Sequence, residues 1–476
     1  MKHKEELPMT STRPKRQLLL DFACEEEPPV AEEPLGGQSC AAVVGKPALE
    51  SATEELMELI VEPDNMERAW KRVRANRGAP GVDGMTIGEF PDYIREHWPR
   101  IRQQLLEGTY QPKPVRRKSI PKPDGGQRML GIPCVLDRVI QQAVLQVLTP
   151  IFDPELSESS FGFRPGRSAH GAVKQVRSYI KQGYRYCVDM DLSKFFDRVQ
   201  HDVLMHRVAR KVRDKRLLRL IGCYLRAGVM VDGLVQSTEQ GTPQGGPLSP
   251  LLANILLDDL DKELERRGLR FARYADDFLI LVKRYRSARQ VFGSVGRFLT
   301  RKLKLVVNRR KSRFGKTDGI EFLGFRLVGK QGEIRLTAKN LAKFKARVRE
   351  ITGRNRGISM ERMIGELSRY LRGWTGYFAL ASAKRIFTRL DAWIRRRVRM
   401  CYWKQWRYPR TRIRKLMQLG VDRHTAICHG ASRKAYWRMS KTLGGHIGMT
   451  KRWLRDQGLV FIRYLWGNLA PLRRTA

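Results

Sequence analysis

The sequence is short of cysteine and lacks any long apolar run. Its seven cysteines are scattered over 476 residues, and no two of them have the spacing of a Cys-x-x-Cys pair. That distribution argues against a zinc ribbon or a disulfide framework and suits a reducing cytoplasm. No apolar run approaches the roughly 18 residues of a membrane-spanning helix, and the polar N-terminus does not resemble a secretory signal. We therefore expect a cytoplasmic protein with no zinc and no membrane partner.

Acidic residues are also scarce relative to basic ones. The chain holds 92 Lys and Arg against 48 Asp and Glu, a formal net charge of +44. Self-repulsion on this scale disfavours a compact state, so a nucleic acid is the expected partner. The excess is greatest in residues 384–476, which hold 24 basic residues, three acidic residues and six of the nine tryptophans. Cations interleaved with large rings suit phosphates and stackable bases, which makes Arg395, Arg396 and Lys404 candidate RNA-binding residues.

Composition and periodicity divide the rest of the chain. Residues 1–50 have the composition of a disordered acidic leader. The apolar pattern of 137–152 predicts a helix that Pro150 ends. A second predicted helix begins at Pro250, with Ser249 as its cap. Strands are predicted over 305–312 and 320–327, and three later helices over 338–352, 360–380 and 383–406.

Two adjacent carboxylates interrupt a run of strand-forming residues. Phe271–Tyr274 and Phe278–Val282 flank them, which predicts a hairpin with Asp276 and Asp277 at its turn. Adjacent carboxylates repel each other, so a divalent cation would offset the cost of ionising both. The alternative interpretation is a solvated turn that happens to be acidic.

A second predicted strand also ends in acids. The two-residue period places Asp189 and Asp191 on one face, and Phe196 follows closely. Phosphoryl transfer through two metal ions needs carboxylates from separate segments, and Asp191 would meet Asp276 and Asp277 if their strands were neighbours. A large side chain at Phe196 could block a ribose 2′-hydroxyl. For a single acid, the commoner alternative is a satisfied strand-end Asp.

A basic hairpin is predicted ahead of these segments. Its β-prone arms, 115–121 and 127–132, flank a Pro-Asp-Gly-Gly turn. Lys122 and Arg128 could meet the phosphates of a nucleoside triphosphate. An ordinary basic surface hairpin is the alternative.

Two glycine-containing loops complete the candidate site. The loop 159–167 holds Arg164 among aromatic residues and could offer phosphate contacts and stacking faces, or it could be a structural turn. The Gln244-Gly245-Gly246 run precedes a buried helix. Glycine has no Cβ, so a ligand could approach this backbone closely.

From about residue 65 onward, these motifs together resemble the reverse transcriptase/maturase proteins encoded within bacterial group II introns, of the type that lacks an endonuclease. The Tyr274–Asp277 box is similar to the family's catalytic palm turn. Asp191 with Phe196 resembles the first catalytic Asp and the aromatic gate against ribonucleotides. Asp189 is the rival for the first position, but its spacing to the aromatic residue fits less well.

The resemblance assigns the remaining candidates to nucleotide and template. Those implied to bind or adjoin the incoming dNTP are Lys122, Arg128, Phe196, Gln244 and Gly245. Those implied to contact the RNA template are Arg164 and Lys311. Gly373–Tyr377 resembles the maturase-specific thumb, which separates the intron proteins from retron-type and diversity-generating reverse transcriptases.

The fold that the resemblance implies is α+β: a right-hand polymerase whose fingers and palm contain an antiparallel sheet, followed by an all-α thumb and a basic C-terminal region. The expected divisions are a leader over 1–50, fingers and palm over 51–335, a thumb/maturase domain over 336–406 and a nucleic-acid-binding region over 407–476.

The implied function is RNA-directed DNA synthesis, together with binding of the group II intron RNA to assist its splicing. Two Mg²⁺ ions, or Mn²⁺, would lie between Asp191, Asp276 and Asp277, and the partners would be intron RNA, an RNA template, a DNA primer or target, and dNTPs. Such a protein is expected in the bacterial cytoplasm, at the nucleoid when it acts on DNA. The alternatives are a non-enzymatic RNA-binding splicing cofactor and a retron-type or diversity-generating reverse transcriptase.

Overall fold

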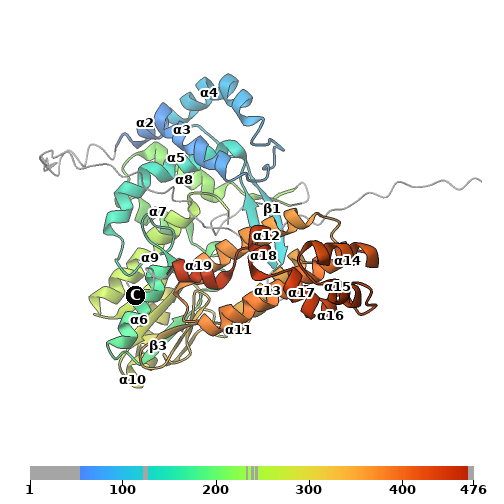
Figure 1. Cartoon of the computed structure of the whole chain (residues 1–476). Helices are drawn as coiled ribbons and strands as arrows, with labels where there is room; N and C mark the ends of the chain where they lie inside the picture. Colours follow the sequence, from blue (N-terminus) through green and yellow to red (C-terminus); the bar gives the residue numbers. More distant parts are fainter. Residues whose placement is uncertain (1–53, 122–126, 232–233, 237–240, 242–244, 470–476) are drawn as a thin grey trace, which may run out of the picture. The chain divides into compact units, whose positions relative to one another are not determined.

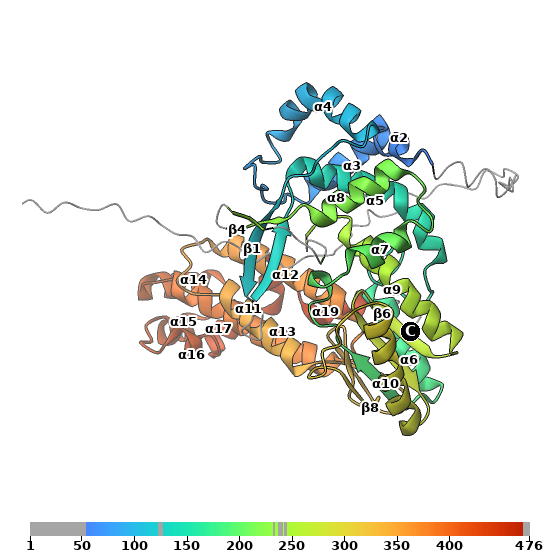
Figure 2. The same ribbon diagram turned by 180° about the vertical axis from the view of Figure 1, so that it is seen from behind.

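The computed structural model describes residues 54–121, 127–231, 234–236, 241 and 245–469. These fall into two compact units, one ending at Leu341 and the other beginning at Ala342. Figures 1 and 2 show the chain from opposite sides. The predicted leader over 1–50 lies outside the described residues, and the division at 406 stays a prediction.

The first unit alternates helices with short strands. Its helices are α2 (Leu56–Ile60), α3 (Pro63–Ala75), α4 (Phe90–Leu106), α5 (Val135–Phe152), α6 (Ala169–Lys181), α7 (His201–Val208), α8 (Lys215–Arg226), α9 (Ser249–Arg266) and α10 (Tyr285–Arg301), with short 3₁₀ turns η1 (Asp153–Glu155) and η2 (Phe195–Asp197). Its strands are β1 (Val115–Pro121), β2 (Gln127–Ile132), β3 (Tyr186–Met190), β4 (Val229–Val231), β5 (Leu234–Gln236), β6 (Arg270–Tyr274), β7 (Asp277–Val282), β8 (Arg313–Lys316), β9 (Glu321–Phe322), β10 (Phe325–Val328) and β11 (Glu333–Leu336).

An antiparallel sheet with the strand order β6-β7-β3-β8 carries the acidic segments. Met190 pairs with Phe278 and Val188 with Ile280, so the ends of β3 and β7 lie side by side. One face of the sheet contributes apolar side chains to the main core, where α9 and α10 pack against it. The predicted hairpin over 271–282 is confirmed, with β6 and β7 joined by two residues.

The basic hairpin is confirmed as well. β1 and β2 pair antiparallel over the predicted ranges, and β4 adds to the other edge of β1 in parallel, as Figure 2 shows. The turn of this hairpin, 122–126, lies outside the described residues.

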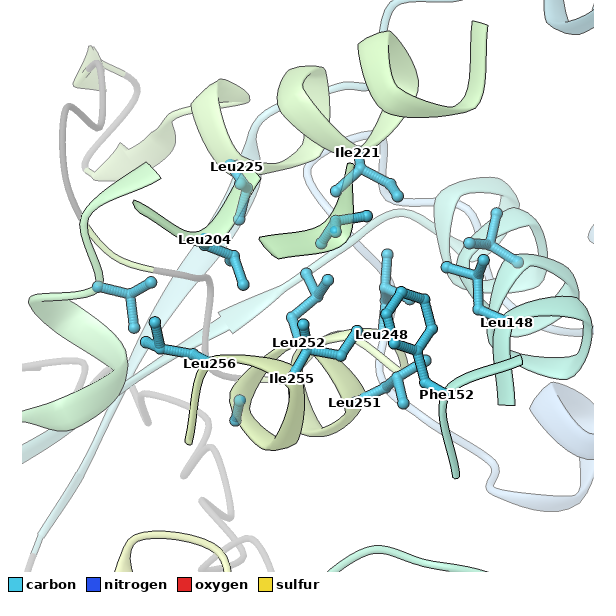
Figure 3. Close-up of a cluster of buried hydrophobic side chains, with 14 of the residues drawn as sticks. Leu148, Phe152, Leu204, Ile221, Leu225, Leu248, Leu251, Leu252, Ile255 and Leu256 are labelled. Carbon is cyan, nitrogen blue, oxygen red and sulfur yellow. The ribbon is translucent and has the colours of Figure 1, made fainter. Parts of the chain in front are cut away.

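Leucines from several helices form the core that supports this sheet. A stripe of leucines on one side of α9 is buried, since Leu252, Leu256 and Leu260 are at most 3% exposed. In Figure 3 side chains of this helix face Leu204 of α7 and Leu225 of α8. Truncating one such leucine to alanine typically costs about 2–5 kcal/mol, so this cluster is what holds the sheet and the helices together.

Four details of the sequence prediction were wrong. The helix α5 does not end at Pro150 but continues two residues further, to Phe152, so the proline only removes one i→i−4 hydrogen bond from the last turn. Ser249 is the first residue of α9 and not its cap. The strand expected over 305–312 is reduced to an isolated bridge before β8. The strand expected over 320–327 folds back on itself as β9 and β10.

The second unit is helical, as predicted. Its helices are α11 (Ala338–Ile351), α12 (Met360–Tyr377), α13 (Lys384–Gln405), α14 (Pro409–Gln418), α15 (Arg423–Gly430), α16 (Tyr436–Met439), α17 (Leu443–Gly448), α18 (Lys451–Asp456) and α19 (Ile462–Asn468), with the 3₁₀ turn η3 (Phe378–Leu380). Trp374, from the predicted thumb signature, packs against Phe344 and Phe378 with ring centroids 4.3 and 4.9 Å away. Asp391 of α13 accepts hydrogen bonds of 2.9 Å from the first backbone N–H groups of α19.

Within the described part of the chain, no helix has both the length and the apolar character needed to cross a membrane.

Candidate active site

The turn between β6 and β7 presents the two adjacent carboxylates. Tyr274 pairs with Asp277, which leaves Ala275 and Asp276 as the two loop residues. Ala275 has φ +56°, a left-handed conformation that two-residue hairpin turns favour and that is strained for a residue with a Cβ. Such a conformation persists only where its surroundings hold it.

Those surroundings are a buried polar network around Arg273. Its Nη1 donates to the carbonyl of Ala275 (3.1 Å) and to Oδ1 of Asn254 (2.9 Å), and its Nε donates to Asp261 (2.8 Å). Neither Arg273 nor Asp261 has any exposed side-chain surface. Asn254 in turn donates to the carbonyl of Gly162 (2.8 Å). The turn is therefore tied to α9 and to the loop before α6.

Asp191 follows β3 and lies next to this turn. Because Met190 pairs with Phe278, the next residue along each strand brings Asp191 opposite Asp277. Its carboxylate accepts a hydrogen bond from Nδ2 of Asn308 (2.9 Å). Its backbone N–H donates to Oγ of Ser312 (3.0 Å). The strand end and the turn thus bring Asp191, Asp276 and Asp277 together, as the sequence predicts for neighbouring strands.

The electrostatics of Asp277 reflect this crowding. Desolvation, followed by the negative charges of Asp276, Asp191 and Asp189, raises its pKa to about 6, and Lys311 opposes that shift. The residue is still exposed to solvent, so the desolvation comes from the protein atoms crowded around it and not from complete enclosure. A carboxylate whose pKa is raised by neighbouring carboxylates marks a site where a cation would lower the energy of the ionised state.

Asp189, the rival for the first catalytic position, has a partner of its own. Arg313 of β8 lies 3.2 Å from its carboxylate, and desolvation raises its pKa while Arg313 opposes that shift. This ion pair gives Asp189 a structural role within the sheet and leaves Asp191 at the strand end beside the turn.

The structure also tests whether the three carboxylates fit a metal. Among the described residues, no group of three or more His, Cys, Asp and Glu side chains is arranged to hold an ion by itself. Mg²⁺ in polymerase sites is usually bound through one or two carboxylates, with waters and substrate phosphates completing its shell. The mutually repelling Asp191, Asp276 and Asp277 fit that kind of open site.

Arg164, predicted to contact the template, lies inside its loop. Its side chain is 3% exposed and forms an ion pair of 2.7 Å with Asp153. Its other donors reach the backbone carbonyls of Ser157 (2.6 Å) and Ser160 (3.0 Å). The guanidinium therefore shapes the loop, and direct contact with a template is disfavoured. The exposed ring in this loop is that of Phe163, whose centroid is 6.1 Å from that of Tyr274.

Gly241 lies against the backbone of Phe196, and Gly245 lies against the basic hairpin. Phe196 is half-buried and packs edge-on against Phe195, with a centroid distance of 5.1 Å. A Cβ added at Gly241 would lie 2.9 Å from the carbonyl oxygen of Phe196, and one added at Gly245 would overlap the carbonyl of Gly131 in β2. The predicted sugar gate and the basic hairpin are thus each approached closely by one glycine that precedes α9.

Several predicted nucleotide contacts lie at the limit of the described residues. Lys122 and Gln244 fall outside them. The backbone of Arg128 is described within β2, where it pairs with Ile120.

The predicted RNA-binding residues of the second unit contact aromatic rings. Arg396 lies 3.8 Å from the ring centroid of Trp437 and donates to its carbonyl oxygen (3.2 Å). Arg395 lies 5.9 Å from the ring of Phe461, and Lys404 lies 5.6 Å from that of Tyr436. Arg396 is thus engaged within the fold, while Arg395 and Lys404 make looser contacts.

Comparison with known proteins agrees with this geometry. Residues 120–327 match the family model described as reverse transcriptase (RNA-dependent DNA polymerase). Residues 341–420 match the maturase-specific domain of group II introns. The chain belongs to the group II intron-encoded reverse transcriptase/maturase family. As members of this family do, it joins an RNA-directed DNA polymerase domain to a maturase domain.

Individual members of the family and related structures vary in length. The chain is 33% identical to Protein YkfC of Escherichia coli over 60% of this chain and 86% of that protein. It is 36% identical to the group II intron-encoded protein LtrA of Lactococcus lactis over 46% of this chain, but spans only 36% of LtrA. A solved chain titled Partial Cas6-RT-Cas1–Cas2 complex is 26% identical over 53% of this chain and 43% of that one, with a TM-score of 0.34.

Sequence reasoning missed the residues that support this candidate site. Asn308 and Ser312 lie in the segment predicted as a strand, and a strand prediction does not indicate that their side chains contact Asp191. The network of Arg273, Asp261 and Asn254 carried a weak signal, since an acid and an amide stand within the buried stripe of α9.

Proposed function

We propose that Asp191, Asp276 and Asp277 form the catalytic centre at which this protein extends a DNA primer on an RNA template. The observation that supports the proposal best is the pairing of Met190 with Phe278, which sets Asp191 opposite Asp277 beside the turn that carries Asp276. Three carboxylates from two segments at one end of an antiparallel sheet suit phosphoryl transfer.

The residues of the chain would act by binding and orienting the substrates. Asp191, held by Asn308, and the acids of the turn would hold two Mg²⁺ ions, or Mn²⁺, which supply charge stabilisation for the α-phosphate and for the leaving pyrophosphate. The primer 3′-oxygen bonds to the α-phosphorus as the bond to pyrophosphate breaks, and the hydroxyl proton passes to solvent. Lys122, Arg128, Gln244 and Gly245 would bind or adjoin the incoming dNTP, and Phe196 would exclude a 2′-hydroxyl.

The maturase-specific domain supports a second role for the same protein. We propose that the helical unit binds the folded group II intron RNA, assists its splicing and presents it for copying into DNA during intron mobility. The large excess of basic over acidic residues in 384–476 favours a polyanionic partner. Recognition of RNA by shape and through exposed loops suits a surface of cations and aromatic rings.

Primer extension with a DNA primer, an RNA template and MgCl₂ tests the catalytic centre. We expect Asp276→Asn to abolish extension while binding of a group II intron RNA is retained, because the substitution removes one charge at the turn only. Asp92→Asn on α4 is the matched control, since it removes an exposed carboxylate paired with Arg95. Extension that persists in Asp276→Asn would overturn the assignment.

A further inference from the structure

An open depression in the helical unit is lined by arginines and indole rings. It lies between the end of α11, the turn that follows this helix, α13 and Trp437 of α16, and it encloses about 660 Å³. The charged residues that line it are Arg349, Arg354, Arg356 and Arg397.

The positive charge in this depression is poorly neutralised. Arg356 pairs with Glu366 (2.7 Å), but no described residue forms an ion pair with Arg349, Arg354 or Arg397. Desolvation, with the charges of Arg349 and Arg354, lowers the pKa of Arg397. Like charges held together without carboxylates make a site that attracts an anion.

Aromatic rings lie within the same depression. Trp393 is half-buried, and the guanidinium groups of Arg349 and Arg397 lie 5.7 and 5.8 Å from its ring centroid. Arg397 is fixed by a hydrogen bond from its Nη2 to the carbonyl of Thr352 (3.1 Å). Trp437 is held from one side by Arg396. The rings are thus positioned by internal contacts, and the arginines on the turn remain exposed.

We propose that this depression binds an unpaired nucleotide of the intron RNA. The phosphate lies between Arg349 and Arg354, whose planar donor groups match phosphate oxygens, and the adjoining base packs against Trp393. Stacking requires a base that is not already stacked in a helix, so the ligand is a single-stranded loop or bulge and not a duplex. The proposal rests on the RNA-binding role proposed above, and all the residues it uses lie within the matched maturase-specific domain.

Binding measurements with the full chain test this site. The probes are a fluorescent single-stranded RNA of about 20 nucleotides, long enough to cover a site of this kind, and a blunt RNA duplex of the same length. The test variant is Arg349→Gln/Arg354→Gln. The matched control is Arg385→Gln/Arg389→Gln, which removes two exposed charges from α13 outside the depression.

We expect the test variant to bind the single strand about tenfold more weakly than the control does, because charge-assisted hydrogen bonds to a phosphate are lost. The slope of log affinity against log salt should fall by about 0.7, because one phosphate contact on a single strand is lost. Trp393→Leu should weaken binding of the single strand about tenfold without changing that slope, because stacking releases no counterions. Binding of the duplex should be the same in the test and control variants.

Equal losses in the test and control variants would overturn the proposal, since only the net charge would then matter. A larger loss for the duplex than for the single strand would overturn it as well. If the double variant is misfolded by circular dichroism, Arg349→Lys/Arg354→Lys replaces it, and unchanged single-strand affinity in both that variant and Trp393→Leu overturns the proposal. Failure of the unaltered protein to bind intron RNA would instead contradict the proposed function.

Discussion

Arg273 and Asp261 form an ion pair from which solvent is wholly excluded. Nε of Arg273 lies 2.8 Å from Oδ1 and 3.0 Å from Oδ2 of Asp261, and both side chains are 0% exposed. Removing one member of such a pair leaves an uncompensated buried charge and costs about 3–5 kcal/mol. The pair itself is therefore a poor target for substitution, but the same guanidinium also contacts Asn254 and Ala275, which connects the pair to the acidic turn.

Asn254→Ala tests whether this network positions the turn. The substitution removes an acceptor from Arg273 and the donor to the carbonyl of Gly162, but it leaves the ion pair in place. We expect kcat for primer extension to fall by about tenfold to a hundredfold, because small displacements of catalytic groups have effects of that size. KM for dNTP should change little. Steady-state primer extension with varied dNTP separates the two constants.

Asp259→Asn is the matched control for this prediction. Asp259 stands on the same helix, but its carboxylate pairs with Arg207 (2.8 Å) and Arg210 (2.8 Å) and not with the turn. It should lower the unfolding temperature without lowering kcat. If both variants lower kcat in proportion to their loss of stability, the network supports only the fold.

Gly162→Ala tests the contact between the loop and the turn from the other side. A Cβ at this position would overlap the backbone of Tyr274 and Ala275, which is not free to move as a flexible side chain would be. We expect primer extension to be lost, whereas the binding of intron RNA, proposed for the second unit, should be unaffected. Gly166→Ala in the same loop is the control, because no atom lies within 4 Å of the Cβ that it adds. Its φ of +66° strains a residue with a Cβ by about 1–2 kcal/mol, and the variant should remain active.

Local patterns in the sequence were enough to predict the hairpins and most helices. The run of strand-forming residues over 271–282, interrupted by two acids, was enough to predict the hairpin and its turn. The neighbour of β7 was not predictable in this way, because pairing between segments almost ninety residues apart leaves no local signal. The sequence therefore predicts that Asp191 meets Asp277 only if their strands are neighbours. The register of β3 and β7 shows that they are.

Residues that act through backbone contacts were beyond the reach of sequence patterns. The sequence predicts that Arg164 contacts a template. In the structure its guanidinium donates hydrogen bonds to Asp153 and to carbonyl groups of its own loop. An arginine in a glycine-containing loop has the same sequence pattern whether it contacts a template or stabilises its own loop. Ala275 likewise has a left-handed φ that its residue type does not favour, because the surrounding network and not the local sequence determines it.

Phe196→Ala tests the proposed gate against ribonucleotides. The ring is half-buried against Phe195, so shortening it opens space at this position without removing a fully buried core residue. We expect incorporation of rNTPs to rise relative to dNTPs, while dNTP incorporation itself persists. The ratio of kcat/KM for dCTP and CTP measures this discrimination. An unchanged ratio in a variant that still extends primers would remove the gate role.

Asp137 at the start of α5 predicts a pH dependence of stability. Its carboxyl is 2% exposed and accepts a hydrogen bond from Tyr110 Oη (2.9 Å). Desolvation raises its pKa from the ordinary value of 3.8 to about 7. Between these two values the folded state holds a proton that the unfolded chain has lost. The free energy of unfolding therefore falls as pH rises from about 4 to 7 and levels off above pH 7.

Asp137→Asn should remove this contribution, because an amide does not titrate. The contribution of three pKa units is at most about 4 kcal/mol, and water entering around Asp137 would reduce it. Urea unfolding at pH 5 and pH 8 gives the change in the free energy of unfolding with pH for the unaltered protein and for Asp137→Asn. The difference between these two changes measures the contribution of Asp137. The slope is the right quantity, because Asn at this position places a donor near the N–H of Lys113 and so has a pH-independent cost. The control Asp92→Asn should keep the slope of the unaltered protein, and an equal slope in Asp137→Asn would show that this carboxyl ionises normally in the fold.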